Sequence, residues 1–103
     1  MISIIIPVIN EEENLKKLLP YLQENNAEEI IIVDGGSTDK SREVAKKFRV
    51  KIITSDKGRA KQMNAGAKAA TGNILYFVHA DSLPPKNFSA AILDHLTEKI
   101  QFG

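Results

Sequence analysis

Four short apolar runs alternate with four stretches of helical periodicity along the whole chain. The runs are residues 2–6, 29–33, 50–54 and 73–78, and isoleucine and valine are common in them. The second and the fourth are apolar at nearly every position, which is typical of strands buried on both faces of a sheet. Such strands, separated by amphipathic helices, predict an α/β fold: an open, parallel βαβαβαβα sheet with helices on both faces.

The helical stretches are recognised by apolar residues three and four positions apart. In the first, we expect Asn10 to be the N-cap and Glu13 its partner in a capping box. Pro20 removes a backbone donor, so this helix should kink or end near Leu19. The expected inward-facing residues are Leu15, Leu18, Leu19 and Leu22, then Val44, Ala45 and Phe48 in residues 38–48, then Ala60, Met63, Ala67 and Ala70 in residues 59–70, and finally Phe88, Ile92, His95 and Leu96.

Length and composition exclude several classes of protein. The 103 residues are enough for one domain, expected to span residues 1–103. Because 14 Lys and Arg balance 13 Asp and Glu along the chain, no basic face for nucleic acid is expected. The absence of cysteine excludes disulfides, thiolate zinc sites and cysteine nucleophiles. No apolar run approaches the ~18 residues of a membrane span, and residues 1–9 resemble a strand more than a signal peptide, so a cytoplasmic location is expected.

A ligand of an open parallel sheet binds outside the carboxyl ends of its strands. Here those ends are residues 7–12, 34–38, 55–59 and 79–85, which hold most of the unexpectedly placed polar residues. The first of these segments contains three consecutive glutamates and no glycine, so it cannot cradle a pyrophosphate as dinucleotide-binding folds do.

Two aspartates follow buried strands at this edge. Asp34 is followed by Gly35 and Gly36, and either Ser37 or Thr38 can cap the next helix. Asp34 therefore either shapes a strand-to-helix turn or accepts hydrogen bonds from a base or ribose. Asp81 is either a turn aspartate, which is favoured when it is considered alone, or a carboxylate that holds a divalent metal together with phosphate oxygens.

Basic residues open the third helix, where they oppose the helix dipole. Lys57 and Arg59 flank Gly58 at this point, which indicates either an anion such as a diphosphate or a solvated loop. Gly66, inside the same helix, costs ~1 kcal/mol relative to alanine, which close packing or the approach of a ligand would justify. His95 lies on an apolar face, and a partly buried histidine with a backbone partner is favoured over a catalytic one.

Taken together, four segments resemble the N-terminal half of family 2 glycosyltransferases of the GT-A type. The matching stretches are residues 4–12, 31–39, 57–66 and 79–81, within a likeness that extends to about Pro85. The resemblance implies a Rossmann-like, nucleotide-sugar-binding fold and a UDP- or GDP-linked sugar as donor. It implies that Pro7, Glu12 and Asp34 hold the nucleoside, that Arg59 and Asn64 line the donor pocket, and that Asp81 binds Mn²⁺ or Mg²⁺.

The sequence departs from the family pattern at two positions. His79 stands where the first aspartate of an aspartate-any-aspartate motif is usual, which is similar to a known subgroup. Asp34-Gly35-Gly36 replaces the commoner Asp-Asp-Gly.

The resemblance predicts the donor-binding half of an inverting, metal-assisted glycosyltransferase. Family members continue into a region that binds the acceptor and supplies the general base, so no catalytic residue is assigned and the 103-residue chain should have little activity alone. Apolar surface left bare could make it a homo-oligomer, and a lipid-linked acceptor would place it at the inner face of a membrane. The alternatives are a non-catalytic nucleotide-binding module and a subunit completed by a partner chain.

Overall fold

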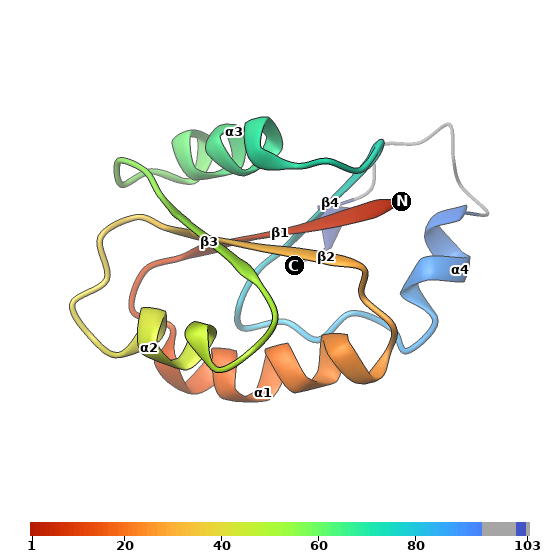
Figure 1. Cartoon of the computed structure of the whole chain (residues 1–103), viewed down its shortest axis with the longest axis horizontal. Helices are drawn as coiled ribbons and strands as arrows, with labels where there is room; N and C mark the ends of the chain where they lie inside the picture. The colour runs from red at the N-terminus through yellow and green to blue at the C-terminus, as the bar shows by residue number, and fades with distance from the viewer. Residues whose placement is uncertain (94–100, 103) are drawn as a thin grey trace.

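A single parallel sheet organises the chain. The structure is a computed structural model that describes residues 1–93 and 101–102. Within these residues five strands are hydrogen-bonded in the order β3-β2-β1-β4-β5, all parallel (Figure 1). The strands are β1 (Ile2–Val8), β2 (Glu29–Asp34), β3 (Lys51–Thr54), β4 (Ile74–Val78) and β5 (Gln101–Phe102). The predicted parallel sheet is confirmed, whereas β5 was not predicted because two residues show no periodicity.

The register places the carboxyl ends of the strands at one edge of the sheet. β1 lies at the centre, with Val8 opposite Asp34 of β2. Asp34 is in turn opposite Thr54, the last residue of β3. β4 pairs with the other side of β1, so the segment after Val78 leaves from the same edge. Four polar loops therefore converge there, as the sequence predicted.

Helices cover both faces of the sheet, which also confirms the prediction. α1 (Glu12–Glu24), α2 (Ser41–Lys46) and α4 (Phe88–Leu93) lie on one face, and α3 (Arg59–Ala69) lies on the other (Figure 1). The larger core joins alternate residues of β1, such as Ile4 and Ile6, to the buried leucines of α1. The smaller core contains Ile5, Ile31 and Val33 beneath α3.

α1 continues through its proline, so of the two expected outcomes, a kink or an end near Leu19, the end is wrong. The helix runs to Glu24 with Pro20 inside it. Leu18, Leu19 and Leu22 are fully buried, and each such burial stabilises by about 1.5–3 kcal/mol, against a cost of ~3 kcal/mol for an interior proline. The carbonyl that loses its partner belongs to Lys16, a solvent-exposed residue, so water can hydrogen-bond to it.

The other helices agree with the predicted faces, except α3. α2 is shorter than the predicted residues 38–48; its Val44 and Ala45 are buried, and Phe48, two residues after its end, packs against the larger core. In α4, Phe88 and Ile92 are buried, and the predicted His95 and Leu96 lie outside the described residues.

The predicted alanine and methionine stripe of α3 is wrong in part. Ala67 and Ala70 do pack against the smaller core, but Ala60 is exposed and the buried residues of α3 are Gln62 and Gly66. A Cβ at Gly66 would lie 2.4 Å from Cγ2 of Ile5 and 3.0 Å from Cγ2 of Val33. Close packing therefore accounts for this glycine, and the helix approaches the sheet through the residue that has no side chain.

A buried carboxylate joins the amino ends of the strands at the opposite edge. Glu29 accepts hydrogen bonds from the Ser3 hydroxyl at 2.6 Å, from the Thr71 amide and hydroxyl at 2.9 and 2.8 Å, and from the Lys51 ammonium at 2.8 Å. Its side chain is only 8% exposed. Burial by itself would raise the pKa of Glu29, but the hydrogen bonds from Lys51, Ser3 and Thr71 outweigh it and lower the pKa to about 2.

We predict that Glu29→Gln destabilises the fold in a pH-dependent way. Because the pKa of Glu29 falls from 4.5 to about 2 on folding, its contribution is complete above about pH 4.5 and is lost as the pH falls toward 2. At pH 7 the variant should lose about 1–3 kcal/mol of unfolding free energy in urea denaturation, and near pH 2 the two proteins should converge. The exposed neighbour variant Glu28→Gln should match the wild type at both pH values. A pH-independent loss in Glu29→Gln would contradict this assignment.

Candidate functional site

Asn10 joins the loop after β1 to the loop after β2. Its Oδ1 accepts hydrogen bonds from the amides of Thr38 at 2.8 Å and Asp39 at 3.2 Å, and its own amide donates to the Ser37 hydroxyl at 2.9 Å. Its backbone adopts a left-handed conformation with φ of 53°, which asparagine tolerates better than most residues. Asn10 is therefore not the N-cap of α1; that position is Glu11, and the expected capping box with Glu13 is wrong.

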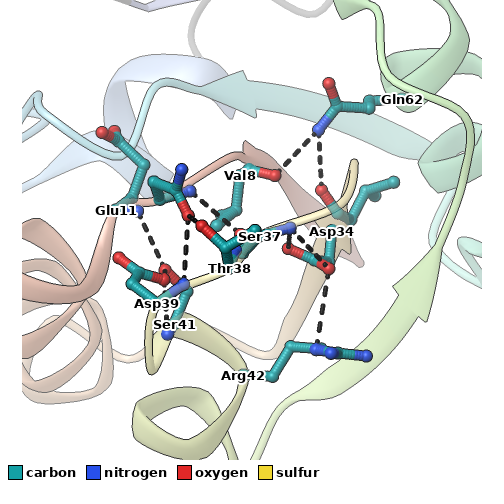
Figure 2. Close-up of polar contacts among 11 residues, drawn as sticks. Val8, Glu11, Asp34, Ser37, Thr38, Asp39, Ser41, Arg42 and Gln62 are labelled. Atoms are coloured by element: carbon teal, nitrogen blue, oxygen red, sulfur yellow. Dashed lines mark hydrogen bonds and ion pairs between the residues drawn. The ribbon is translucent and has the colours of Figure 1, made fainter.

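Residues at the start of α1 and residues at the start of α2 accept hydrogen bonds from each other's backbone amides. The amide of Glu12 donates to Asp39 Oδ2 at 3.2 Å. The amide of Glu11 donates to the Ser41 hydroxyl at 2.9 Å (Figure 2). In return, the amide of Lys40 donates to Glu12 Oε1 at 3.1 Å. Asp39 also accepts the amide of Ser41, the first residue of α2, so neither Ser37 nor Thr38 caps that helix. Burial would raise the pKa of Asp39, but its hydrogen bonds with Ser41 and Glu12 lower it.

Asp34 is the last residue of β2, immediately before the turn, and is 2% exposed. Its two carboxylate oxygens accept the amide of Ser37 at 3.2 and 3.3 Å, and Oδ2 lies 3.7 Å from Arg42 Nε (Figure 2). The amide of Gly35 donates to the Val8 carbonyl at 2.9 Å, which fixes the turn against the end of β1. The carboxylate of Asp34 is thus bound by groups of the same chain, as expected if this residue shapes the turn from strand to helix.

A cleft of about 300 Å³ opens at the carboxyl edge of the sheet. Three segments line it: residues 7–9 with Glu11 after β1, residues 57–59 with Gln62 at the start of α3, and residues 79–80 after β4. Lys57 and Arg59 are exposed, and the first turn of α3 contains no acidic residue. A negatively charged group in this cleft would meet two cations and the positive end of a helix dipole.

The structure brings two of the six predicted site residues into the cleft, Pro7 and Arg59. Four others lie around it. Glu12 is engaged by Lys40 and by Lys16, whose Nζ lies 3.7 Å away, and Asn64 is exposed on α3. Asp34 is buried behind the edge, and Asp81 is exposed one residue beyond the cleft residue Ala80. Asp34 nevertheless ends β2 and Asp81 follows β4, and these two strands flank β1 on either side, so both residues lie at one edge of the sheet.

Two polar residues of the cleft were not singled out from the sequence, Glu11 and Gln62. The sequence does not show which of the three consecutive glutamates lines the cleft, because the direction of each side chain depends on the left-handed backbone turn at Asn10. Gln62 could have been identified from the sequence, because it lies one helical turn before Gly66 and therefore on the same face of α3, which packs against the sheet.

A divalent metal fits this edge only if its ligand brings further donors. Within residues 1–93 and 101–102, no group of three or more His, Asp or Glu side chains could hold an ion. One exposed carboxylate, Asp81, and the imidazole of His79 at the cleft supply oxygen and nitrogen donors. Together with diphosphate oxygens, such a set suits Mn²⁺ or Mg²⁺. In the same described part of the chain, no helix has the length and apolar character needed to cross a membrane.

The structure defines an α/β domain with a cleft at the carboxyl edge of a parallel sheet, which is the edge where such sheets generally bind ligands. The sequence model of glycosyl transferase family 2 matches residues 3–100. The chain therefore belongs to that family.

Curated relatives agree with this assignment. The chain is 34% identical to a dolichol-phosphate mannosyltransferase of Pyrococcus furiosus, over 99% of its own length and 30% of the relative. It is 37% identical to a dolichyl N-acetyl-alpha-D-glucosaminyl phosphate 3-beta-D-2,3-diacetamido-2,3-dideoxy-beta-D-glucuronosyltransferase of Methanococcus voltae, over 84% of its own length and 31% of the relative. It thus spans about a third of the length of these proteins.

Among solved structures, glucosyl-3-phosphoglycerate synthase of Mycobacterium tuberculosis in complex with UDP has the same fold. The TM-score is 0.81 at 21% sequence identity, and the match covers 93% of this chain and 39% of the synthase chain.

We predict that the stability of the two-loop junction depends on both properties of Asn10. Asn10→Gly keeps the left-handed conformation but removes the side-chain acceptor, whereas Asn10→Ala removes both. The unfolding free energy should therefore decrease from wild type to Asn10→Gly to Asn10→Ala, with a total loss of about 1–3 kcal/mol in chemical denaturation. Equal stability of the three proteins would show that these hydrogen bonds do not hold the loops together.

Proposed function

We propose that this chain forms the donor-binding part of a glycosyltransferase and takes a UDP- or GDP-linked sugar into the cleft at the carboxyl edge of the sheet. The observation that carries the proposal is the pair of cations, Lys57 and Arg59, at the start of α3 on one side of that cleft. Membership in glycosyl transferase family 2 supports it, since the activity is expected to be that of the family.

The diphosphate is the part of the donor that the start of α3 suits best. Free amides at a helix N-terminus, the helix dipole and two basic side chains all favour a negatively charged group. Glu11, elsewhere on the lining, is an acceptor and suits hydroxyl or N–H donors of the nucleoside. We therefore assign the nucleoside to the loop after β1, with Pro7 and Glu11, and the diphosphate to Lys57 and Arg59. Glu12 has a structural role, because its carboxylate already contacts the Lys40 amide and the Lys16 ammonium.

Asp81 and His79 are the residues that would hold Mn²⁺ or Mg²⁺ beside the diphosphate. When bound, such an ion would neutralise the charge that develops on the leaving nucleoside diphosphate. The structures of the related synthase include complexes with Mn²⁺ and UDP and with Mg²⁺ and UDP, which supports a divalent cofactor. The names of two relatives contain dolichol or dolichyl, which supports a lipid-linked acceptor and thus a site of action at a membrane surface.

We predict that the 103-residue chain binds UDP or GDP in a metal-dependent way. In isothermal titration calorimetry, one of the two should bind at least tenfold more tightly with millimolar Mn²⁺ than with EDTA, a difference of about 1.4 kcal/mol or more. Arg59→Ala should weaken binding about tenfold with or without metal, because it removes a charge-assisted contact. Asp81→Asn should remove most of the effect of Mn²⁺ and leave the affinity measured in EDTA unchanged.

Two matched variants control for charge. Arg49→Ala removes an exposed arginine before β3, at the opposite edge of the sheet, and Asp56→Asn removes an exposed aspartate after β3 that does not line the cleft. Both should bind as the wild type does. The proposal is wrong if neither nucleotide gives heat at millimolar concentration with Mn²⁺, or if Arg59→Ala binds as tightly as the wild type.

A further inference from the structure

A buried carboxamide lies at the base of the cleft. Gln62 is 3% exposed, and its Nε2 donates to the carbonyl of Val8 at 3.1 Å and to the carbonyl of Val33 at 3.0 Å (Figure 2). These carbonyls belong to the ends of β1 and β2, which are neighbours in the sheet. Both hydrogens of the amide group are therefore used to join the two strands where the polar loops begin.

The orientation of this carboxamide is determined by its partners. Exchanging its oxygen and nitrogen would place Oε1 against two carbonyl oxygens, which is repulsive. Oε1 therefore faces the turn into α3, where the amide of Gly58 donates to it at 3.4 Å. A single side chain thus connects three segments: the end of β1, the end of β2 and the turn that carries Lys57 and Arg59.

Gly35 leaves the space that this carboxamide occupies. A Cβ at Gly35 would lie 2.7 Å from Cδ of Gln62 and 2.8 Å from both Nε2 and Oε1, closer than real Cβ atoms approach. The backbone cannot easily shift, because the amide of Gly35 is bonded to the Val8 carbonyl. Conformation does not require a glycine here, since the left-handed glycines among the described residues are Gly36 and Gly58. Space is the reason for this glycine.

We propose that Gln62 is a positioning residue of the donor site, and that position 35 is glycine so that its carboxamide can enter. This inference rests on the proposed function, because it assumes that the nucleotide binds in this cleft. It also explains the departure from the commoner Asp-Asp-Gly: a side chain at position 35 and the carboxamide of Gln62 exclude each other. An uncharged group from α3 therefore stands where that motif has a carboxylate, and it sets the place of Gly58 and Arg59 relative to β1.

The proposal is tested by a double-mutant cycle with two readouts, the urea midpoint and the affinity for UDP or GDP with Mn²⁺. Gln62→Ala should weaken nucleotide binding at least fivefold under conditions where the variant is folded. Gln62→Glu should not restore it, because a carboxylate cannot donate to the carbonyls of Val8 and Val33. Gly35→Ala should lower both the midpoint and the affinity by displacing the carboxamide. In the Gln62→Ala background, Gly35→Ala should add little further loss, because the clash is gone.

Two controls separate positioning from general stability. Ile30→Val, in the core of β2 near its amino end, should lower the urea midpoint and leave the affinity unchanged. Gln23→Ala, at an exposed position of α1, should change neither.

Additive losses from Gly35→Ala and Gln62→Ala would overturn the shared-space argument, and wild-type affinity in Gln62→Ala would overturn the positioning role. If the wild-type chain binds neither nucleotide, the proposed function fails and the positioning role falls with it. The urea cycle still decides by itself whether Gly35 and Gln62 share space.

Discussion

Parallel pairing of β1 with β2 on one side and β4 on the other is the constraint on which the rest of the molecule depends. It brings three chain segments, separated by many residues, to one edge of the sheet. The loops there are then joined by side chains: Asn10 binds the amides of the loop after β2, and Gln62 binds carbonyls near the ends of two strands. Most of these contacts link residues more than twenty positions apart. The cleft therefore exists only in the folded sheet, and no single segment contains it.

The two edges of the sheet have different chemistry. At the amino edge, Glu29 is satisfied by Ser3, Lys51 and Thr71, so its charge is used internally. At the carboxyl edge, Lys57 and Arg59 are exposed, and neither forms an ion pair among the described residues. A charge engaged inside the protein supports the fold, whereas an exposed cation beside a cleft can meet a ligand. This difference agrees with the proposed donor site at the carboxyl edge and with a structural role for Glu29 at the amino edge.

The fold was largely predictable from the sequence, because apolar runs and leucine spacing report burial directly. The errors arose where tertiary contacts outweigh local preference. The buried leucines of α1 carry the helix through Pro20, and Asn10 serves the neighbouring loop in place of its own helix. For the candidate site, the edge that holds the cleft and the basic residues at the start of α3 could be predicted. Which side chains line the cleft could not, because Glu11 and Glu12 differ only in the direction that the turn at Asn10 gives them.

Gly66 has a mechanical consequence for ligand binding. With its backbone in contact with Ile5 and Val33, α3 has no layer of side chains at that point over which it could roll or slide. α3 is therefore held close to the sheet at Gly66, with Arg59 at its first position and Lys57 two residues before it. In the proposed donor site, the phosphate end of the ligand would then have a fixed place at the start of α3, and donors of different size would be accommodated by the loops after β1 and β4.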